Sequence, residues 1–300
     1  MIKKSIHYLT FLFFLLFVGF IALIPFRILY LLADGVAWLL RRVFKYRLAV
    51  VKKNLSRTNL SLTPEEEKNA IREIYRNLAD VLLEGVKSFS MSRESIIKRH
   101  KVLNPELVNP FHARGQSLIL VTGHIGNWEW GSLSAGIQTP YQILGFYKPV
   151  KNRYIDRFLR YSRSKFGTLL APIKQTSLSF ERQKETPTVF LMAADQNPSK
   201  VSQAIWQPFL GRDTAFLHGP EKHATKNNYP VIFAEIHRIK RGMYELTLSV
   251  LTENPKENAP GEITALYAGK LEKYIRKNPA SWLWTHKRWK HTPPEKTMKP

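Results

Sequence analysis

Apolar and polar positions follow one another along this chain in patterns that predict both strands and helices. Compact apolar runs containing β-branched residues predict buried strands. These runs fall at residues 117–122, 141–147, 188–194, 229–237 and 243–251. Apolar residues at helical spacing predict amphipathic helices over residues 63–82, 152–166 and 263–277. The succession predicts an α/β fold with a mixed central sheet flanked by helices.

Two further stretches carry clear local signals. Thr63 can cap a helix in which Pro64 takes the first position, and Glu66 completes a capping box. Residues 208–220 contain repeated Pro and Gly, which predict a turn-rich connection.

The first long apolar run, residues 8–26, contains no charged residue. As a helix rising about 1.5 Å per residue it can span the core of a bilayer. Lys3 and Lys4 are typical of a signal peptide, but the run is long for one, and the nearest small-x-small triplet, residues 33–35, lies well beyond it. We therefore predict an uncleaved membrane anchor over residues 1–34. More basic residues follow the run than precede it, so the body of the protein is expected in the cytoplasm; if the run is only half inserted, these residues would still hold it on anionic lipid.

The remaining chain is long and apolar enough for one substantial domain, predicted at 35–290, and the Pro- and Lys-rich residues 291–300 are predicted to be a disordered tail. The net charge is +23, and both the first sixty residues and the rest are basic. This charge predicts an anionic partner: phospholipid, phosphorylated glycolipid, acidic carrier protein or nucleic acid. The absence of cysteine excludes a disulfide framework, a thiol nucleophile and a Cys-based metal site.

Residues 117–131 hold the most informative pattern of chemical groups. His124 follows a predicted strand, and Asn127 can cap a helix that begins just after it and carries Glu129. On one continuous helix His124 and Glu129 would be about 140° apart, but a turn followed by a first helical turn can bring them together. Glu129 would then hold one imidazole nitrogen and leave the other as a general base. Alternatively, His124 is an ordinary loop histidine and Glu129 an acid favoured by the helix dipole. Residues 123–127 do not form the G-x-S-x-G pattern of a serine nucleophile.

Two other features are candidates for a binding role. Four arginines lie within roughly a 120° arc on one side of the predicted helix 152–166. They form either a docking surface for phosphate or a carrier protein, or an ordinary solvated face. The four are Arg153, Arg157, Arg160 and Arg163. Asp195 directly follows the strand 188–194, at a strand end where a site residue is often found.

These motifs resemble those of the lipid A biosynthesis late acyltransferases, which are related more distantly to glycerol-phosphate acyltransferases. His124 to Glu129 is similar to the HxxxxE/D motif of that family. The other matching blocks occur in the same order and extend to about residue 290. They are Tyr147-Lys148-Pro149 with Asn152 and Asp156, then Arg163, Asp195-Gln196, Phe209-Leu210-Gly211, and Trp284-Thr285-His286-Lys287-Arg288.

The resemblance implies acyl transfer from an acyl-carrier-protein thioester to a hydroxyl of a lipid A precursor, without metal or cofactor. It implies a glycerol-phosphate-acyltransferase-like sheet and a bacterial inner-membrane location with the catalytic domain on the cytoplasmic side. His124 is the expected base, oriented by Glu129, and Arg163 and Lys148 are expected to bind the oxyanion or phosphates. Lys148 stands where the family usually has Arg, and lysine lacks the two-point fork of a guanidinium. The expected supporting residues are Asn127 and Asp195.

Other functions remain open at the level of sequence. The acceptor is either a lipid A precursor or another anionic glycolipid, such as a phosphatidylinositol mannoside, and the donor is carried either by acyl carrier protein or by coenzyme A. Trp128 and Trp130 either line an acyl channel or pack in the core. A basic, non-enzymatic protein of the membrane surface or of nucleic acid is the alternative of another class. We expect no nucleic-acid partner, because the sequence has no nucleic-acid-binding motif and begins with an anchor.

Overall fold

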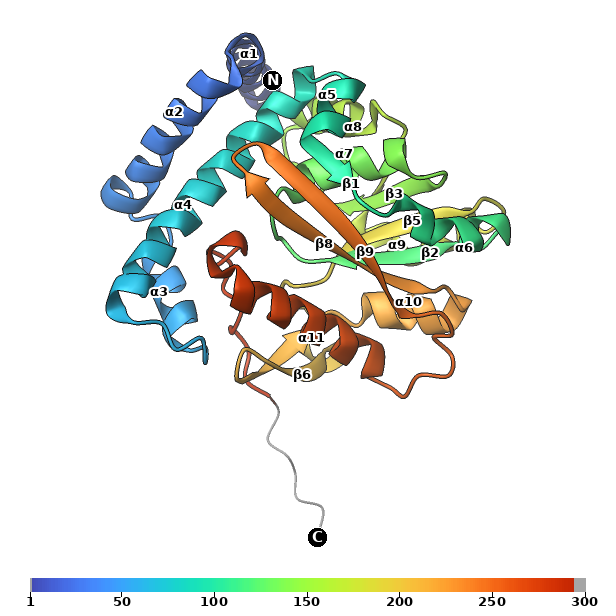
Figure 1. The fold of residues 1–300 in the computed structure, drawn as a ribbon. Helices are drawn as coiled ribbons and strands as arrows, with labels where there is room; N and C mark the ends of the chain where they lie inside the picture. Colours follow the sequence, from blue (N-terminus) through green and yellow to red (C-terminus); the bar gives the residue numbers. More distant parts are fainter. Residues whose placement is uncertain (1, 294–300) are drawn as a thin grey trace.

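The computed structural model describes residues 2–293, and its centre is a seven-stranded sheet with helices on both faces (Figure 1). The strand order is β1-β9-β8-β2-β5-β3-β4, and every neighbouring pair is parallel except the antiparallel β8–β9. The predicted mixed sheet is therefore confirmed. The strands are β1 (His100–Val102), β2 (Leu118–Thr122), β3 (Gln142–Tyr147), β4 (Leu169–Pro172), β5 (Thr188–Ala193), β8 (Val231–Lys240) and β9 (Met243–Thr252).

All five predicted strands are present as β2, β3, β5, β8 and β9, whereas β1 and β4 were not predicted. These two lie at the sheet edges and contain three and four residues, too few to show a pattern. At the predicted turn-rich connection 208–220, β6 (Ile205–Phe209), which begins before it, and β7 (Arg212–Phe216), which lies inside it, form an antiparallel pair. Pro208 makes β6 unlike a strand in sequence, and Leu210 and Gly211 form the tight turn with positive φ angles of 52° and 79°.

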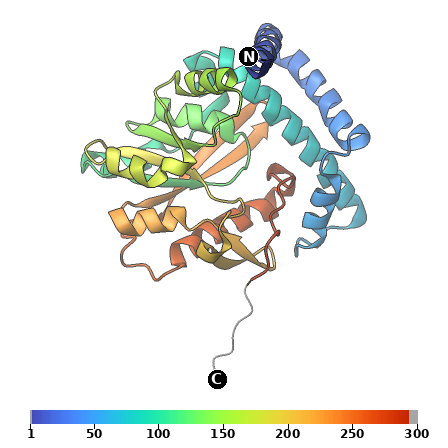
Figure 2. The same ribbon diagram turned by 180° about the vertical axis from the view of Figure 1, so that it is seen from behind.

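The helices cover the two faces of the sheet in separate groups. Helices α7 and α8 lie on one side, and α10 and α11 on the other (Figures 1 and 2). The helices after the N-terminal pair are α3 (Leu48–Ser56), α4 (Pro64–Lys87), α5 (Arg93–Arg99), α6 (Asn109–Ala113), α7 (Trp128–Gln138), α8 (Arg153–Ser164), α9 (Thr176–Arg182), α10 (Gly219–Asn227) and α11 (Glu262–Lys277). Helix α4 starts with the predicted capping box, because the Thr63 hydroxyl accepts from the Glu66 amide and the Glu66 carboxylate accepts from the Thr63 amide.

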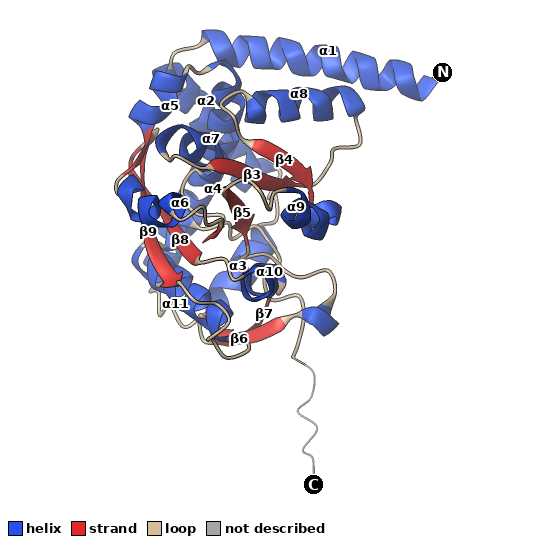
Figure 3. Cartoon of the chain, turned by 90° about the vertical axis from the view of Figure 1, so that its right-hand side faces the viewer, coloured by secondary structure: helices blue, strands red, loops and turns tan. Residues whose placement is uncertain are grey.

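The N-terminal helix α1 (Ile2–Leu23) runs alongside α8 at the edge of the molecule (Figure 3). Its aromatic rings contact α8, for example Phe14 with Phe158 at a centroid distance of 5.4 Å. Lys87 donates hydrogen bonds to the carbonyls of Ile21, Ala22 and Ile24, which caps the C-terminal end of α1. Lys4–Leu23 is the one segment among the described residues that is long and apolar enough to cross a membrane, and it is mostly exposed.

Helix α2 (Phe26–Trp38) packs along α4. The predicted boundary between anchor and domain at residue 34 lies inside α2, so the helix continues from one predicted part into the other. Most of the predicted tail, 294–300, lies outside the described residues.

Candidate active site

His124 lies in the turn between the buried strand β2 and helix α7. The turn depends on Gly126, whose φ of 54° is in the left-handed region. A Cβ atom at this position would come within 2.6 Å of Cγ2 and 2.8 Å of the carbonyl oxygen of Ile236. Asn127 then caps α7 as predicted, because its Oδ1 accepts from the Trp130 amide over 2.9 Å. The local sequence therefore sets the direction in which His124 points.

The imidazole of His124 is held by Asp195. Nδ1 of His124 lies 2.6 Å from Oδ1 of Asp195, and the backbone amide of His124 donates to Oδ2 over 2.8 Å. Sheet register explains the contact: β2 and β5 are parallel neighbours with Thr122 opposite Ala193, and His124 and Asp195 each follow by two residues. Trp282 Nε1 also donates to Asp195 Oδ2 over 2.8 Å. The Asp195 side chain, which is 3% exposed, is thereby fixed by three donors.

The pKa values of His124 and Asp195 are shifted in opposite directions. Burial opposes protonation of His124, but the charge and hydrogen bond of Asp195 outweigh it and raise the pKa of the imidazole, with Glu129 adding in the same direction. Burial alone would raise the pKa of Asp195, but His124 and Trp282 lower it to about 2. Asp195 is therefore ionised and can only accept, so the proton of a neutral His124 resides on Nδ1.

The second imidazole nitrogen is left as an acceptor. Nε2 of His124 lies 3.2 Å from the amide nitrogen of Gln196, which can only donate. A substrate hydroxyl that replaces this weak contact would meet an unprotonated nitrogen of a partly exposed ring. This is the geometry that a general base requires.

Glu129 lies near His124 but makes a different contact from the predicted one. Its two carboxylate oxygens accept from Nη2 of Arg163 on α8 over 3.0 and 2.9 Å. The predicted hydrogen bond to the imidazole is made by Asp195 instead, because the first turn of α7 directs Glu129 toward α8 while the sheet register brings Asp195 to the ring. Glu129 and Arg163 are each about one-third exposed, so the pair lies at the surface of the site.

The structure does not bring all of the predicted residues together. Lys148 is exposed just after β3, and within residues 2–293 it makes no hydrogen bond or ion pair with another predicted site residue. Asn127 is fully buried and joins the site through its role as a cap. Trp130 packs in the core, whereas Trp128 makes an edge contact with the His124 ring at a centroid distance of 5.2 Å.

Glu84 on α4 supports the turn that carries His124 through a hydrogen bond to Asn127, and the sequence analysis did not identify it. Its carboxylate accepts from Asn127 over 2.7 Å, from Tyr244 over 2.8 Å and from Tyr30 over 2.9 Å. Its carbonyl oxygen also accepts from the Trp130 indole over 2.9 Å. Burial raises the pKa of Glu84 to about 7, although the two tyrosine hydrogen bonds oppose the shift. The sequence signal for Glu84 was an acidic residue on the apolar face of an amphipathic helix. Its partners could not be predicted, because they come from α2, β9 and the start of α7, which lie elsewhere in the chain.

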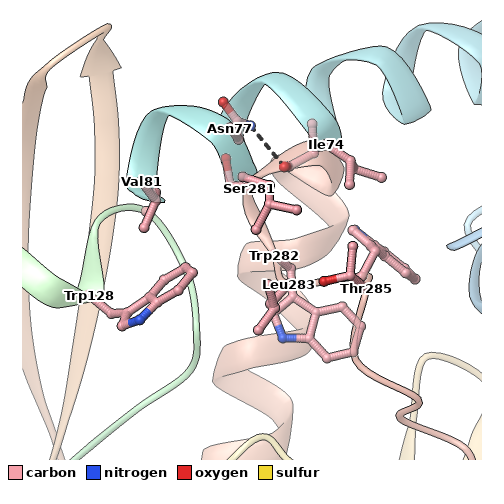
Figure 4. Close-up of a pocket in the computed structure, with 12 residues that line it drawn as sticks. Ile74, Asn77, Val81, Trp128, Ser281, Trp282, Leu283 and Thr285 are labelled. Atoms are coloured by element: carbon pink, nitrogen blue, oxygen red, sulfur yellow. Dashed lines mark hydrogen bonds between the residues drawn. The ribbon is translucent and has the colours of Figure 1, made fainter. Parts of the chain in front are cut away.

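An apolar pocket opens beside the turn that carries His124, between α4 and the C-terminal segment (Figure 4). Trp128, Val81 and Leu283 are among its lining residues. Asn77 on α4 donates to the carbonyl of Ala280 over 2.8 Å and ties the two walls together. The room inside is about 20 Å³, about that of a single water molecule. The pocket as it stands therefore has no room for a larger ligand.

Comparison with known proteins decides the family of this site. The sequence model of the bacterial lipid A biosynthesis acyltransferases matches residues 2–291. The chain belongs to this acyltransferase family. It is 23% identical over 276 residues to the lipid A biosynthesis lauroyltransferase of Escherichia coli (strain K12), covering 90% of this chain and 88% of that protein. It is also 23% identical over 279 residues to the lipid A biosynthesis acyltransferase of Haemophilus influenzae (strain ATCC 51907 / DSM 11121 / KW20 / Rd), covering 91% and 88%.

Membership makes this chain an acyltransferase of lipid A biosynthesis, and the recognised family resemblance is confirmed. Among the described residues no group of three or more His, Asp or Glu side chains is arranged to hold a metal ion.

Proposed function

We propose that this acyltransferase moves a fatty acyl chain from an acyl-carrier-protein thioester to a hydroxyl of a lipid A precursor, with His124 as the general base. One observation carries the proposal: the Asp195 carboxylate holds Nδ1 of His124 at 2.6 Å and leaves Nε2 as an acceptor at the surface of the turn. A histidine held in this way can take a proton from an alcohol at neutral pH.

The proposed reaction needs no covalent enzyme intermediate. Nε2 of His124 removes the proton of the acceptor hydroxyl as its oxygen attacks the thioester carbonyl. The tetrahedral intermediate collapses and breaks the carbon–sulfur bond. The leaving thiolate then takes the proton back from the imidazolium. Asp195 stabilises that imidazolium while it exists, because its pKa of about 2 keeps it ionised throughout.

Arg163 is the proposed donor to the oxyanion or to a substrate phosphate, and Glu129 is the proposed positioning residue that holds it. The geometry supports this assignment because both Glu129 oxygens accept from one nitrogen, Nη2 of Arg163. The other guanidinium nitrogens therefore remain available for a ligand. Lys148 is proposed to contact a phosphate farther from the reacting carbon, as a single charge.

The proposed location is the cytoplasmic side of a bacterial inner membrane, with α1 as the anchor. Exposed apolar side chains along α1, such as Phe13, Leu16 and Leu23, support membrane contact. The resemblance to glycerol-phosphate acyltransferases stays part of this proposal, with the mixed sheet and the base at a strand end as its support.

A transfer assay with the full chain in detergent tests the proposal. Acyl-carrier-protein thioesters and acyl-coenzyme A are compared as donors, and a tetra-acylated lipid A precursor and a phosphatidylinositol mannoside as acceptors. We expect transfer to the lipid A precursor from the carrier-protein donor, and loss of transfer in His124→Ala. A fully active His124→Ala protein would refute the mechanism, and preferred transfer to the mannoside would refute the acceptor. No transfer to either acceptor, together with tight DNA binding that weakens steeply with salt, would favour the non-enzymatic alternative.

A further inference from the structure

A cleft of about 400 Å³ lies between α3, α4 and the short π-helix Leu39–Val43 that follows α2. It is separate from the site around His124. Four cationic side chains line it, with a single carboxylate and three apolar residues on the walls. The cationic residues are Arg41, Arg42, Lys52 and Lys68, the carboxylate is Glu67, and the apolar residues are Leu48, Pro64 and Ile71.

The charges in this cleft are not balanced by the protein. Lys68 pairs with Glu65 over 3.2 Å. Among the described residues no carboxylate oxygen lies within 4 Å of a charged nitrogen of Arg41, Arg42 or Lys52. Arg41 is half-buried, and burial together with the neighbouring charges of Arg42 and Arg72 lowers its pKa. Like charges crowded in a partly desolvated cleft are stabilised by a bound anion.

A neighbouring cleft provides an internal comparison. It shares Arg41 and has a similar size, about 300 Å³, but it contains both signs of charge. There Arg76 lies 3.2 Å from Asp34, and Arg72 lies 3.6 Å from Glu73. The excess of positive charge is therefore found in the cleft that contains Arg42 and Lys52, and it is not a general property of this surface.

The backbone around the cationic cleft adopts uncommon conformations. The amide of Phe44 donates to the carbonyl of Leu39 over 2.9 Å, which closes one π-helical turn. Lys45 and Arg47 then take left-handed φ angles of 46° and 52°. Single π-turns and left-handed non-glycine residues cost free energy and are frequent at functional sites. These conformations reverse the direction of the chain after the π-helix, so that Lys52 on α3 lines the same cleft as Arg41 and Arg42.

The strained turn is held in place from both sides. The Tyr75 hydroxyl donates to the carbonyl of Tyr46 over 2.6 Å, and Nη1 of Arg47 donates to the carbonyl of Thr285 over 3.0 Å. The cationic cleft is therefore preformed.

Exposed apolar residues lie close to these cations in the chain. Trp38 ends α2 and lines the neighbouring cleft, Val43 ends the π-helix and Phe44 follows it, and the three are 56%, 53% and 70% exposed. Exposed apolar residues beside unpaired cations are the arrangement expected at the level of lipid headgroups, where the apolar groups enter the acyl region and the cations meet phosphates.

We propose that this cleft binds the phosphate ester of an anionic membrane lipid, with Arg41, Arg42 and Lys52 contacting the phosphate and Trp38, Val43 and Phe44 contacting the acyl chains. The phosphate comes either from a phospholipid headgroup or from a phosphorylated glycolipid. This site fixes the height and tilt of α2 against the membrane and does not depend on the proposed chemistry at His124.

Vesicle flotation of the full chain tests the proposal. The vesicles are zwitterionic phosphatidylcholine alone or with phosphatidylglycerol. The variant replaces Arg41, Arg42 and Lys52 together by Gln, and the matched control removes the same charge from exposed positions of α11, Lys270, Lys273 and Lys277. At about fivefold per cation near an anionic surface, the loss of three cations should lower the affinity of the cleft variant for the anionic vesicles about a hundredfold. The control should change less than about threefold. Both should bind zwitterionic vesicles as the parent does.

Further measurements identify the source of the phosphate and exclude misfolding of the cleft variant. Inorganic phosphate should not displace the protein from anionic vesicles, and displacement by it would mean a free-phosphate site and overturn the lipid proposal. Vesicles with a lipid A precursor that carries or lacks its phosphates distinguish the glycolipid from the phospholipid source, since only a true source should be sensitive to the cleft substitutions. Equal losses in variant and control, or a cleft variant that loses only carrier-protein binding, would also overturn the proposal. Unchanged thermal unfolding of the cleft variant, and native binding by a variant with Arg41→Lys and Arg42→Lys, would exclude misfolding.

Discussion

Replacing Asp195 by Asn tests the proposed base more sharply than removing His124. In the native site Oδ2 accepts from the His124 amide and from Trp282, and Oδ1 faces Nδ1 of His124. An asparagine would keep its single oxygen toward the two donors and turn its NH₂ group toward Nδ1. The amide would then donate to Nδ1, which moves the imidazole proton to Nε2 and removes the acceptor that the substrate hydroxyl needs.

The expected effect has two separate parts. The change of tautomer should lower kcat by about a hundredfold to ten-thousandfold. Burial would raise the pKa of Asp195, but the charge and hydrogen bonds of His124, with Trp282, outweigh it and lower the pKa to about 2, so the carboxylate stabilises the imidazolium. Without that stabilisation, burial dominates and the pKa of His124 falls. The acid limb of the activity profile reflects protonation of the base, so it should move to lower pH.

The assay is kcat and kcat/KM for acyl transfer measured across pH, with Glu129→Gln as the matched control. That substitution also removes one negative charge near His124, but it leaves the Nδ1 contact intact. We expect its acid limb to move less and its tautomer to remain native. If Asp195→Asn kept the native rate, or lost rate with an unmoved acid limb while Glu129→Gln moved it, the assignment of Asp195 as the partner of the base would be wrong.

Three other predictions concern the support of the site. Glu84→Ala leaves the donors Asn127, Tyr244 and Tyr30, two of them buried and one partly buried, without their acceptor. It should lower the free energy of unfolding by about 3–5 kcal/mol in a denaturant titration. A loss below about 1 kcal/mol, as for a single exposed contact, would contradict the network. Burial raises the pKa of Glu84 from 4.5 to about 7, so ionising Glu84 costs stability as the pH rises between these values. Over this range the free energy of unfolding of the native protein should fall by about 3 kcal/mol relative to that of Glu84→Gln. Parallel plots of unfolding free energy against pH for the two proteins would show that Glu84 does not titrate there. Gly126→Ala forces an alanine with a left-handed φ angle against Ile236, so it should destabilise the protein by at least about 2 kcal/mol and abolish acyl transfer. The control Gly269→Ala, at an open position of α11, should be neutral or slightly stabilising.

The sequence by itself determined the local parts of the site. The apolar run before His124 makes β2, the Thr63–Glu66 capping box starts α4, and Asn127 caps α7, because each of these depends on residues close together in the chain. The apolar helix α1 is likewise predicted from its own composition. Together they place a histidine on a strand-to-helix turn in a protein with a long, exposed apolar helix at its N-terminal end.

Only the tertiary structure decided which groups meet. Asp195 reaches His124 because β5 lies parallel to β2 in register, although 71 residues separate the two in sequence. Glu129, only five residues away, turns to Arg163 because α8 packs beside α7. The buried Glu84 gains its donors from three separate elements, and the unbalanced charge of Arg41 appears only when α3 folds back onto α4. Spacing along the chain limits which residues are available, but the strand register and helix packing choose their partners.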